Sequence, residues 1–269
     1  MITSTGNSQV KHIMLLNRKA KERRAQGLFV AEGEKMYREA PQSWIRKVYL
    51  SESFQKMNET LRDGIEYETV EDRVFASMCD TKTPQGVLTL LRMPFYEPEQ
   101  VLGGPCPLLM VLEDLQDPGN VGTIIRTAEG AGVTGVILSQ NSADLFNPKT
   151  IRSTMGSIYR MPFLVTSNPV GFVQELKRQG IAVYAAHLNG KNSYRKEDYT
   201  GPTAFLIGNE GNGLSEAMAK EASRLIRIPM EGRVESLNAA VASAILMYEA
   251  HSQRTIAVQT ARRPLPSEQ

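Results

Sequence analysis

Residues 108–139, LLMVLEDLQDPGNVGTIIRTAEGAGVTGVILS, contain the pattern that decides the fold. The run LLMVLE is almost wholly apolar, which is typical of a strand covered on both faces of a parallel sheet. Apolar residues at helical spacing follow at Val121, Ile124, Ile125 and Ala128, and VTGVILS then indicates a second strand. Strand, helix and strand in this order predict a parallel α/β unit.

The same stretch contains GAGVTG, residues 130–135, which spells the dinucleotide-binding fingerprint G-x-G-x-x-G. That fingerprint binds a pyrophosphate only where a strand ends and a helix begins. Here a predicted helix precedes the glycines and a predicted strand follows them. We therefore interpret the glycines as a helix end and a turn, and an NAD oxidoreductase stays only a remote alternative.

Strands and helices continue to alternate along the chain after this unit. We expect strands at 108–113, 133–139, 161–165, 181–186, 203–208 and 224–229, helices at 120–131, 147–157, 170–179 and 214–222, and a long helix over 236–251. This alternation predicts an α/β fold with a doubly wound parallel sheet. The tail from about Gln253 is expected to be loose.

A proline-rich stretch separates this region from a smaller one. Residues 94–107, PFYEPEQVLGGPCP, contain four prolines and two glycines, which is linker composition. The preceding residues predict a small α/β domain, with a basic helix at about 8–25, strands that include 28–30 and 45–50, a helix at 52–62, a strand at 65–70, a short helix through 75 and a strand at 86–91. We expect one domain over 1–95 and a second over 106–255.

Composition excludes several classes of protein. The chain has 269 residues, 41% of them apolar, and no apolar run long enough to cross a membrane. Its start, MITSTGNSQVKH, lacks the apolar core of a secretion signal. Cys79 and Cys106 have no metal-ligand spacing and predict reduced thiols in a cytoplasmic protein. His12, His187 and His251 are far apart in the sequence, so no metal site is expected.

Positive charge gathers near the N-terminus, although the net charge is only +2. Residues 1–30 contain one acid, Glu22, and six basic side chains: Lys11, Arg18, Lys19, Lys21, Arg23 and Arg24. Such a helix can follow the phosphates of a nucleic acid, or it can be an ordinary solvated face. The residues alone leave both interpretations open.

Three loops follow apolar strands at their carboxyl ends, where ligands bind in open α/β sheets. They are residues 113–128 (EDLQDPGNVGTIIRTA), 207–216 (IGNEGNGLSE) and 228–240 (IPMEGRVESLNAA). Asn120 is a candidate helix N-cap, and the glycines of the second loop allow close approach of a ligand. Together the loops supply five polar candidates: Asn120, Arg126, Glu210, Ser236 and Asn238. These residues predict a backbone-lined ligand pocket with an arginine beside it.

The stretches NVGTIIRTA, IGNEGNGLS and IPMEGRVESLNAAVASAI resemble, in order, the three motifs of the SpoU/TrmH family of RNA ribose 2′-O-methyltransferases, part of the SPOUT superfamily. The match spans about 105–250. The N-terminal stretch ITSTGNSQVKHIMLLNRKAKERRAQGLFVAEG resembles the family's substrate-binding domain, which is similar to ribosomal protein L30e. This resemblance favours an RNA contact for the basic helix.

The resemblance implies a C-terminal trefoil knot whose loops bind S-adenosylmethionine. The positions that match the family's cofactor contacts, or adjoin them, are Leu206, Gly208, Ile228, Met230 and Leu237, and the five polar candidates match its catalytic positions. In this family, the arginine at the position that Arg126 matches is often assigned the proton transfer. We prefer a clamp on phosphate or on the developing alkoxide, because a guanidinium stays protonated and offers only donors.

The resemblance also implies a homodimer in which Arg126 faces the cofactor of the other subunit. Ala240, Ala244 and Met247 of the last helix suit either that interface or ordinary core packing. The expected substrate is 23S ribosomal RNA, with tRNA as the alternative. A non-catalytic RNA-binding protein of the same fold is disfavoured, because all five catalytic positions are filled.

Overall fold

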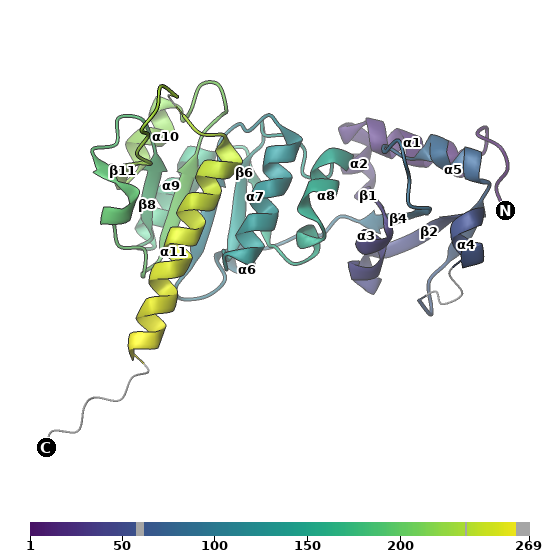
Figure 1. Cartoon of the computed structure of the whole chain (residues 1–269), viewed down its shortest axis with the longest axis horizontal. Coiled ribbons are helices and arrows are strands. Elements are labelled where there is room, and N and C mark those ends of the chain that lie inside the picture. Colours follow the sequence, from purple (N-terminus) through teal and green to yellow (C-terminus); the bar gives the residue numbers. More distant parts are fainter. Residues whose placement is uncertain (58–61, 235, 262–269) are drawn as a thin grey trace, which may run out of the picture. The chain divides into compact units, whose positions relative to one another are not determined.

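The computed structural model describes residues 1–57, 62–234 and 236–261 (Figure 1). The chain divides into two compact units, Met1–Phe95 with Asp144–Arg160, and Tyr96–Ala143 with Met161–Gln269. Residues 144–160, which we assigned to the second domain, therefore pack with the first.

The first unit contains a mixed sheet. Its described strands are β1 (Leu28–Glu32), β2 (Ile45–Ser51), β3 (Tyr67–Val70) and β4 (Val87–Arg92), in the order β1-β4-β2-β3. Its helices are α1 (Ser8–Arg18), α2 (Ala20–Gln26), α3 (Glu34–Glu39), α4 (Glu52–Met57), α5 (Asp72–Met78) and α8 (Pro148–Thr154). Apolar residues of α1 and α5 pack on one face of the sheet, and those of α3 and α4 pack on the other.

The expected basic helix over 8–25 is two helices, because the chain is extended at Lys19 (φ −121°, ψ 107°). Arg23 of α2 is buried, with a side chain only 3% exposed. Its Nε donates to Asp144 Oδ2 at 3.0 Å, and its Nη1 donates to the carbonyl oxygens of Leu16 and Asn17. The prediction that Arg23 contacts RNA is therefore wrong, because its guanidinium is used inside the unit.

Arg23→Glu is expected to destabilise the first unit by about 3–5 kcal/mol, because it replaces the buried guanidinium with a carboxylate that faces the carboxylate of Asp144. Arg24→Glu, next to it but exposed, should change the unfolding free energy by less than about 0.5 kcal/mol. Urea denaturation followed by the fluorescence of Trp44, the chain's one tryptophan, reports on this unit. Equal stability of the two variants would contradict the assignment.

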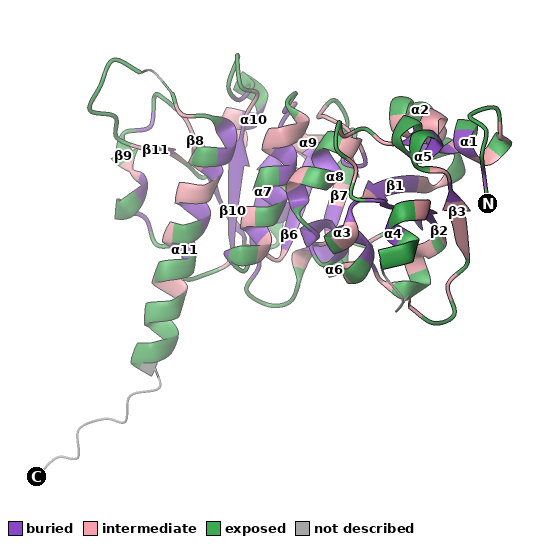
Figure 2. Cartoon of the chain, turned by 45° about the vertical axis from the view of Figure 1, so that its right-hand side comes forward, coloured by how far each residue is buried: buried purple, intermediate pink, exposed green. Residues whose placement is uncertain are grey.

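The second unit contains a parallel sheet. Its described strands are β5 (Leu108–Leu112), β6 (Gly135–Ser139), β7 (Phe163–Thr166), β8 (Ala182–Ala186), β9 (Asn192–Ser193), β10 (Thr203–Ile207) and β11 (Arg224–Arg227). Their order is β7-β6-β5-β10-β8-β11-β9. Every residue of β5, β6 and β10 is buried, as Figure 2 shows for the middle of this sheet. Helices on both faces produce that burial.

The helices of this unit are α6 (Pro98–Leu102), α7 (Pro118–Gly130), α9 (Pro169–Arg178), α10 (Glu216–Glu221) and α11 (Ala239–Ala261). Apolar residues of α6, α9 and α10 pack on one face of the sheet. Helices α7 and α11 contact each other and lie in front of the sheet in Figure 1. Among the helices of the described ranges, none has the length and apolar character needed to cross a bilayer.

The GAGVTG stretch is a helix end and a turn, as predicted. Helix α7 ends at Gly130, Gly132 has a left-handed backbone (φ 74°), and β6 begins at Gly135. A Cβ at Gly135 would collide with the carbonyl oxygen of Val101 in α6, so this glycine allows close packing of α6. The order is the reverse of the one that a dinucleotide fingerprint requires.

Helix α11 continues beyond Gln253, so the expectation of a loose tail from that residue is wrong. Arg254 holds its second half by donating to the backbone carbonyl oxygens of Tyr199 (2.9 Å), Cys106 (3.1 Å), Pro107 (3.0 Å) and Gly201 (2.6 Å). Charge-assisted bonds of this kind stabilise a helix end that propensity alone does not predict.

Candidate active site

A cavity of about 350 Å³ lies at the carboxyl ends of the strands in the second unit. It is lined by the loops that follow β8, β10 and β11 and by the start of α11. Figure 1 shows that α11 begins at the end of the sheet near α10. Ligands bind at this end of open parallel sheets, and the volume suits a small cofactor.

Four of the five predicted cofactor positions line this cavity: Gly208, Ile228, Met230 and Leu237. Leu206 does not line it. Its side chain is fully buried in β10 and belongs to the core cluster that includes residues of α9 and α10. We therefore assign Leu206 to the support of the cavity wall.

Gly208 is needed by its own loop. A Cβ at this position would collide with the carbonyl group of Gly213 and the amide nitrogen of Leu214. The loop closes through two backbone hydrogen bonds, from Asn209 N to Gly213 O at 3.0 Å and from Gly213 N to Asn209 O at 2.9 Å. The sequence predicted room for a ligand here, and the structure adds that the loop cannot close over a side chain.

A hydrogen-bond network joins three of the five predicted catalytic residues. Glu210 Oε1 accepts from Asn120 Nδ2 at 3.0 Å, and Asn120 Oδ1 accepts from Asn238 Nδ2 at 3.0 Å. Glu210 also accepts from the backbone N–H groups of Gln116 (3.0 Å) and Asp117 (3.1 Å). The network thus ties together the loops after β5 and β10 and the start of α11.

The helix caps explain why these side chains are available. Asp117, and not Asn120, is the N-cap of α7, since its carboxylate accepts from the N–H groups of Gly119 and Asn120. That leaves the amide of Asn120 for Glu210 and Asn238. Asn238 Oδ1 accepts from the N–H group of Ala240 at 2.9 Å at the start of α11, so its orientation is fixed by the helix.

Glu210 is ionised at neutral pH. Partial burial raises the pKa of its carboxyl group, but the hydrogen bonds from the backbone of Gln116, the Asn120 amide and the backbone of Asp117 outweigh burial, so the pKa lies below its ordinary value. The carboxylate therefore acts as an acceptor that orients Asn120.

Ser236 and Arg126 lie outside this network. Ser236 is exposed and lines the cavity. Arg126 is exposed on α7, does not line the cavity, and has no hydrogen bond or ion pair with any residue that the structure describes. Within one chain, the arginine is therefore not brought to the other predicted catalytic residues.

The structure adds groups that sequence reasoning missed. The backbone N–H groups of Gln116 and Asp117 could not be assigned to Glu210 without the fold. His187 lines the cavity, and its Nδ1 accepts from the N–H group of Asn189 at 3.1 Å. Across the described ranges, no three His, Cys, Asp or Glu side chains gather as a metal site requires.

Family models match both parts of the chain. The SpoU rRNA methylase family matches residues 107–248, and the MRM3-like substrate-binding domain matches residues 7–89. The 23S rRNA (guanosine(2553)-2′-O)-methyltransferase RlmP of Bacillus subtilis is 36% identical over 248 residues, which cover 92% of this chain and 97% of that protein.

Solved structures give the same result. An AdoMet-bound rRNA methyltransferase from Sinorhizobium meliloti has a TM-score of 0.80 and 33% identity, covering 93% of this chain and 97% of that one. The SpoU methyltransferase AviRb from Streptomyces viridochromogenes, in complex with AdoMet, has a TM-score of 0.83 and 27% identity, covering 93% and 98%.

Fold, site and similarity together define an RNA methyltransferase that uses S-adenosylmethionine. The chain belongs to the SpoU rRNA methylase family.

Proposed function

We propose that the protein transfers the methyl group of S-adenosylmethionine to a ribose 2′-hydroxyl of 23S ribosomal RNA. The observation that carries the proposal is the 350 Å³ cavity with the Glu210–Asn120–Asn238 network. The choice of 23S RNA is supported by the relative from Bacillus subtilis, which covers both parts of the chain. Transfer RNA is the alternative substrate.

The cavity fits the cofactor. Its walls come largely from a glycine-rich loop and from the apolar side chains of Ile228, Met230 and Leu237, which suit a ligand bound through backbone groups. S-adenosylmethionine supplies a methyl group on a sulfonium centre, ready for displacement. The protein has to hold the attacking hydroxyl in line with that group, and positioning alone supplies much of the acceleration.

The polar residues of the site then have different roles. Glu210 is an acceptor already engaged by three donors, so it holds Asn120 and Asn238 in place. Ser236 and the amide of Asn238 are the groups that orient the ribose. Arg126 clamps the neighbouring phosphate or the developing alkoxide, because its guanidinium is a permanent cation with five donors. The hydroxyl proton leaves to phosphate or water.

We propose further that the active enzyme is a homodimer in which Arg126 completes the cavity of the other subunit. Its exposure and its lack of partners in the described part of the chain support this. Of the candidate interface residues, Ala240 and Met247 are buried within their own chain, and Ala244 is half-buried. The outward side of α11 instead presents Val241 and Tyr248, about half exposed, as the surface for the partner.

The first unit is the proposed RNA-binding part. With Arg23 buried, the remaining basic candidates of α1 and α2 are all exposed: Lys11, Arg18, Lys19, Lys21 and Arg24. Their charges suit a phosphate backbone. The C-terminal trefoil knot and a cytoplasmic location stay predictions.

Thermal shift tests the cofactor assignment. S-adenosylmethionine and S-adenosylhomocysteine should each raise the melting temperature of the wild-type protein, because a ligand at 100 times its Kd stabilises the folded state by about 2.7 kcal/mol. NAD should have no effect. A shift with NAD alone would support the oxidoreductase, and no shift with any of the three would support a non-catalytic RNA-binding protein.

A further inference from the structure

Residues Asp144–Arg160 connect β6 to β7 of the catalytic sheet, yet they pack as part of the first unit. Besides the buried pair with Arg23, Tyr159 Oη donates to the carbonyl oxygen of Met36 at 3.0 Å. Arg160 Nη1 lies 2.8 Å from Glu39 Oε2. These bonds make the segment an integral part of the proposed RNA-binding unit.

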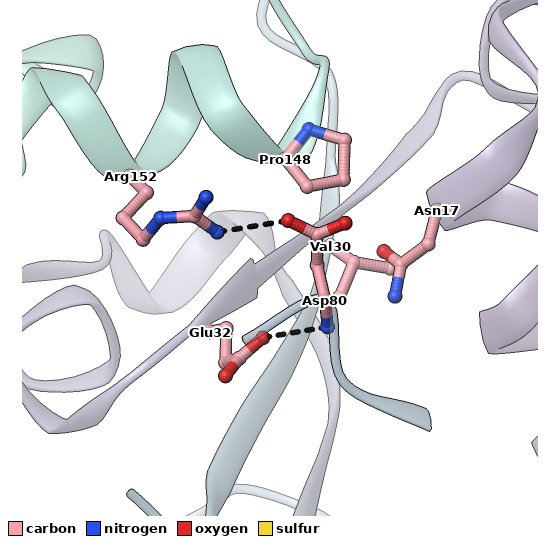
Figure 3. A pocket seen from close by; sticks show the side chains of 6 residues that line it. All are labelled: Asn17, Val30, Glu32, Asp80, Pro148 and Arg152. Atoms are coloured by element: carbon pink, nitrogen blue, oxygen red, sulfur yellow. Dashed lines mark hydrogen bonds and ion pairs between the residues drawn. The ribbon is translucent and has the colours of Figure 1, made fainter. Parts of the chain in front are cut away.

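Helix α8 in this segment begins beside the end of α1. A small recess brings the two together, and Figure 3 shows the residues that line it: Asn17, Val30, Glu32, Asp80, Pro148 and Arg152. Asn17 is the penultimate residue of α1, directly before the exposed Arg18 and Lys19, and Pro148 directly precedes the exposed Lys149.

Basic side chains from distant parts of the sequence therefore gather in one region. Lys149 and Arg152 of α8 are both exposed, and Arg152 lines the same recess as Asn17 at the end of α1. Arg152 pairs with Asp80 at 3.0 Å, with both side chains nearly half exposed. An exposed pair is worth less than about 1 kcal/mol, so a phosphate can take the place of Asp80.

We propose that α8 extends the RNA-binding surface of α1 and α2, with Lys149 and Arg152 binding phosphates of the RNA backbone. This inference rests on the proposed function. RNA bound at α8 would also lie close, along the chain, to the loop that follows β5, because residues just before Asp144 are hydrogen-bonded to that loop. Gln116 Nε2 donates to Asn141 O at 3.0 Å, and Ala143 N donates to Leu115 O at 2.7 Å.

The test compares Lys149→Glu with Lys56→Glu in the full-length protein. Lys56 is also an exposed lysine and lies on α4, which packs beside β2 and β3, while α8 packs beside β1 at the other edge of the sheet. Glutamate at position 149 suits the first turn of a helix, so the fold should persist. Urea unfolding followed by Trp44 fluorescence checks this for each variant.

Filter binding of a transcribed 23S ribosomal RNA over a series of salt concentrations is the measurement. Lys149→Glu should weaken binding about fivefold or more and lower the salt slope by about one, while Lys56→Glu changes neither. The affinity for S-adenosylhomocysteine, measured by calorimetry, should stay at the wild-type value.

Two failures are distinguishable. If Lys149→Glu binds RNA as the wild type does, while Arg18→Glu with Lys19→Glu weakens binding, α8 is not part of the surface and the inference is overturned. If the wild-type protein itself binds no 23S RNA, the proposed function fails and takes the inference with it.

Discussion

Arg126→Ala should lose methyl transfer by a factor of ~10²–10³ or more, which is the usual effect of removing one preorganised charge-stabilising group. The affinity for S-adenosylmethionine should not change, because the proposed clamp holds the phosphate or the developing alkoxide of the RNA and not the cofactor. The fold should not change either, since the side chain is exposed and has no partner in the described ranges. Single-turnover rates, calorimetry and the oligomeric state of the variant together check this expectation.

Two further variants identify the role of this arginine. Arg126→Lys keeps the charge but loses the guanidinium fork, so a clamp predicts partial recovery without a new pH dependence. If position 126 instead acts as a base, the rate of Arg126→Lys should rise with pH through the pKa of the lysine. Arg178→Ala, at an exposed arginine of α9, is the control and should be fully active. Full activity of Arg126→Ala would defeat both roles.

Gly208→Ala should weaken the binding of S-adenosylhomocysteine by at least tenfold, a loss of about 1.4 kcal/mol or more. Even one methyl group would collide with the backbone of Gly213 and Leu214, which cannot move without opening the loop. That loop lines the cavity and carries Glu210, so both the walls and the polar network should be displaced.

Gly211→Ala is the matched control in the same loop. Its Cβ would lie 3.5 Å from Asn209 Oδ1, which is an ordinary contact, and its φ is not left-handed. Calorimetry should therefore find nearly unchanged affinity. Equal losses in the two variants would mean that any side chain in this loop blocks the ligand, and that the closure of the loop is not the reason for Gly208.

The sequence predicts the second unit well, because its strands are continuous apolar runs and its helices repeat apolar residues at helical spacing. Helix α6 was missed within the proline-rich linker, although Glu97 and Gln100 form a capping box with Pro98 at the first helical position. That pattern was visible in the sequence. Helix α3 and the two-residue strand β9 are too short to give a periodic pattern.

Contacts with residues distant in the sequence account for the other differences between the predicted and the observed structure. Arg23 looks like its basic neighbours until Asp144, which is distant in the sequence, is placed beside it. The second half of α11 depends on four carbonyl groups from two distant loops. Local propensity carries no information about either.

In the candidate site, too, some residues could be predicted from the sequence and others could not. Asn120, Glu210 and Asn238 could be grouped from their positions at strand ends, and the structure joins them by hydrogen bonds. The backbone donors of Gln116 and Asp117 could not be found, since their role depends on where the loop after β10 lies. In the dimer that we propose, the place of Arg126 depends on a second chain, which one sequence does not describe.

The most direct test of the account is methyl transfer by the purified protein to unmodified, transcribed 23S ribosomal RNA with S-adenosylmethionine carrying a labelled methyl group. A ribose 2′-O-methyl group protects the next phosphodiester bond from alkali, so hydrolysis followed by primer extension locates it. The account predicts label in one alkali-resistant dinucleotide, absent when Arg126→Ala replaces the wild type. Label on a base of the 23S RNA would contradict the account. So would label only in a parallel reaction with tRNA, or no label in either RNA.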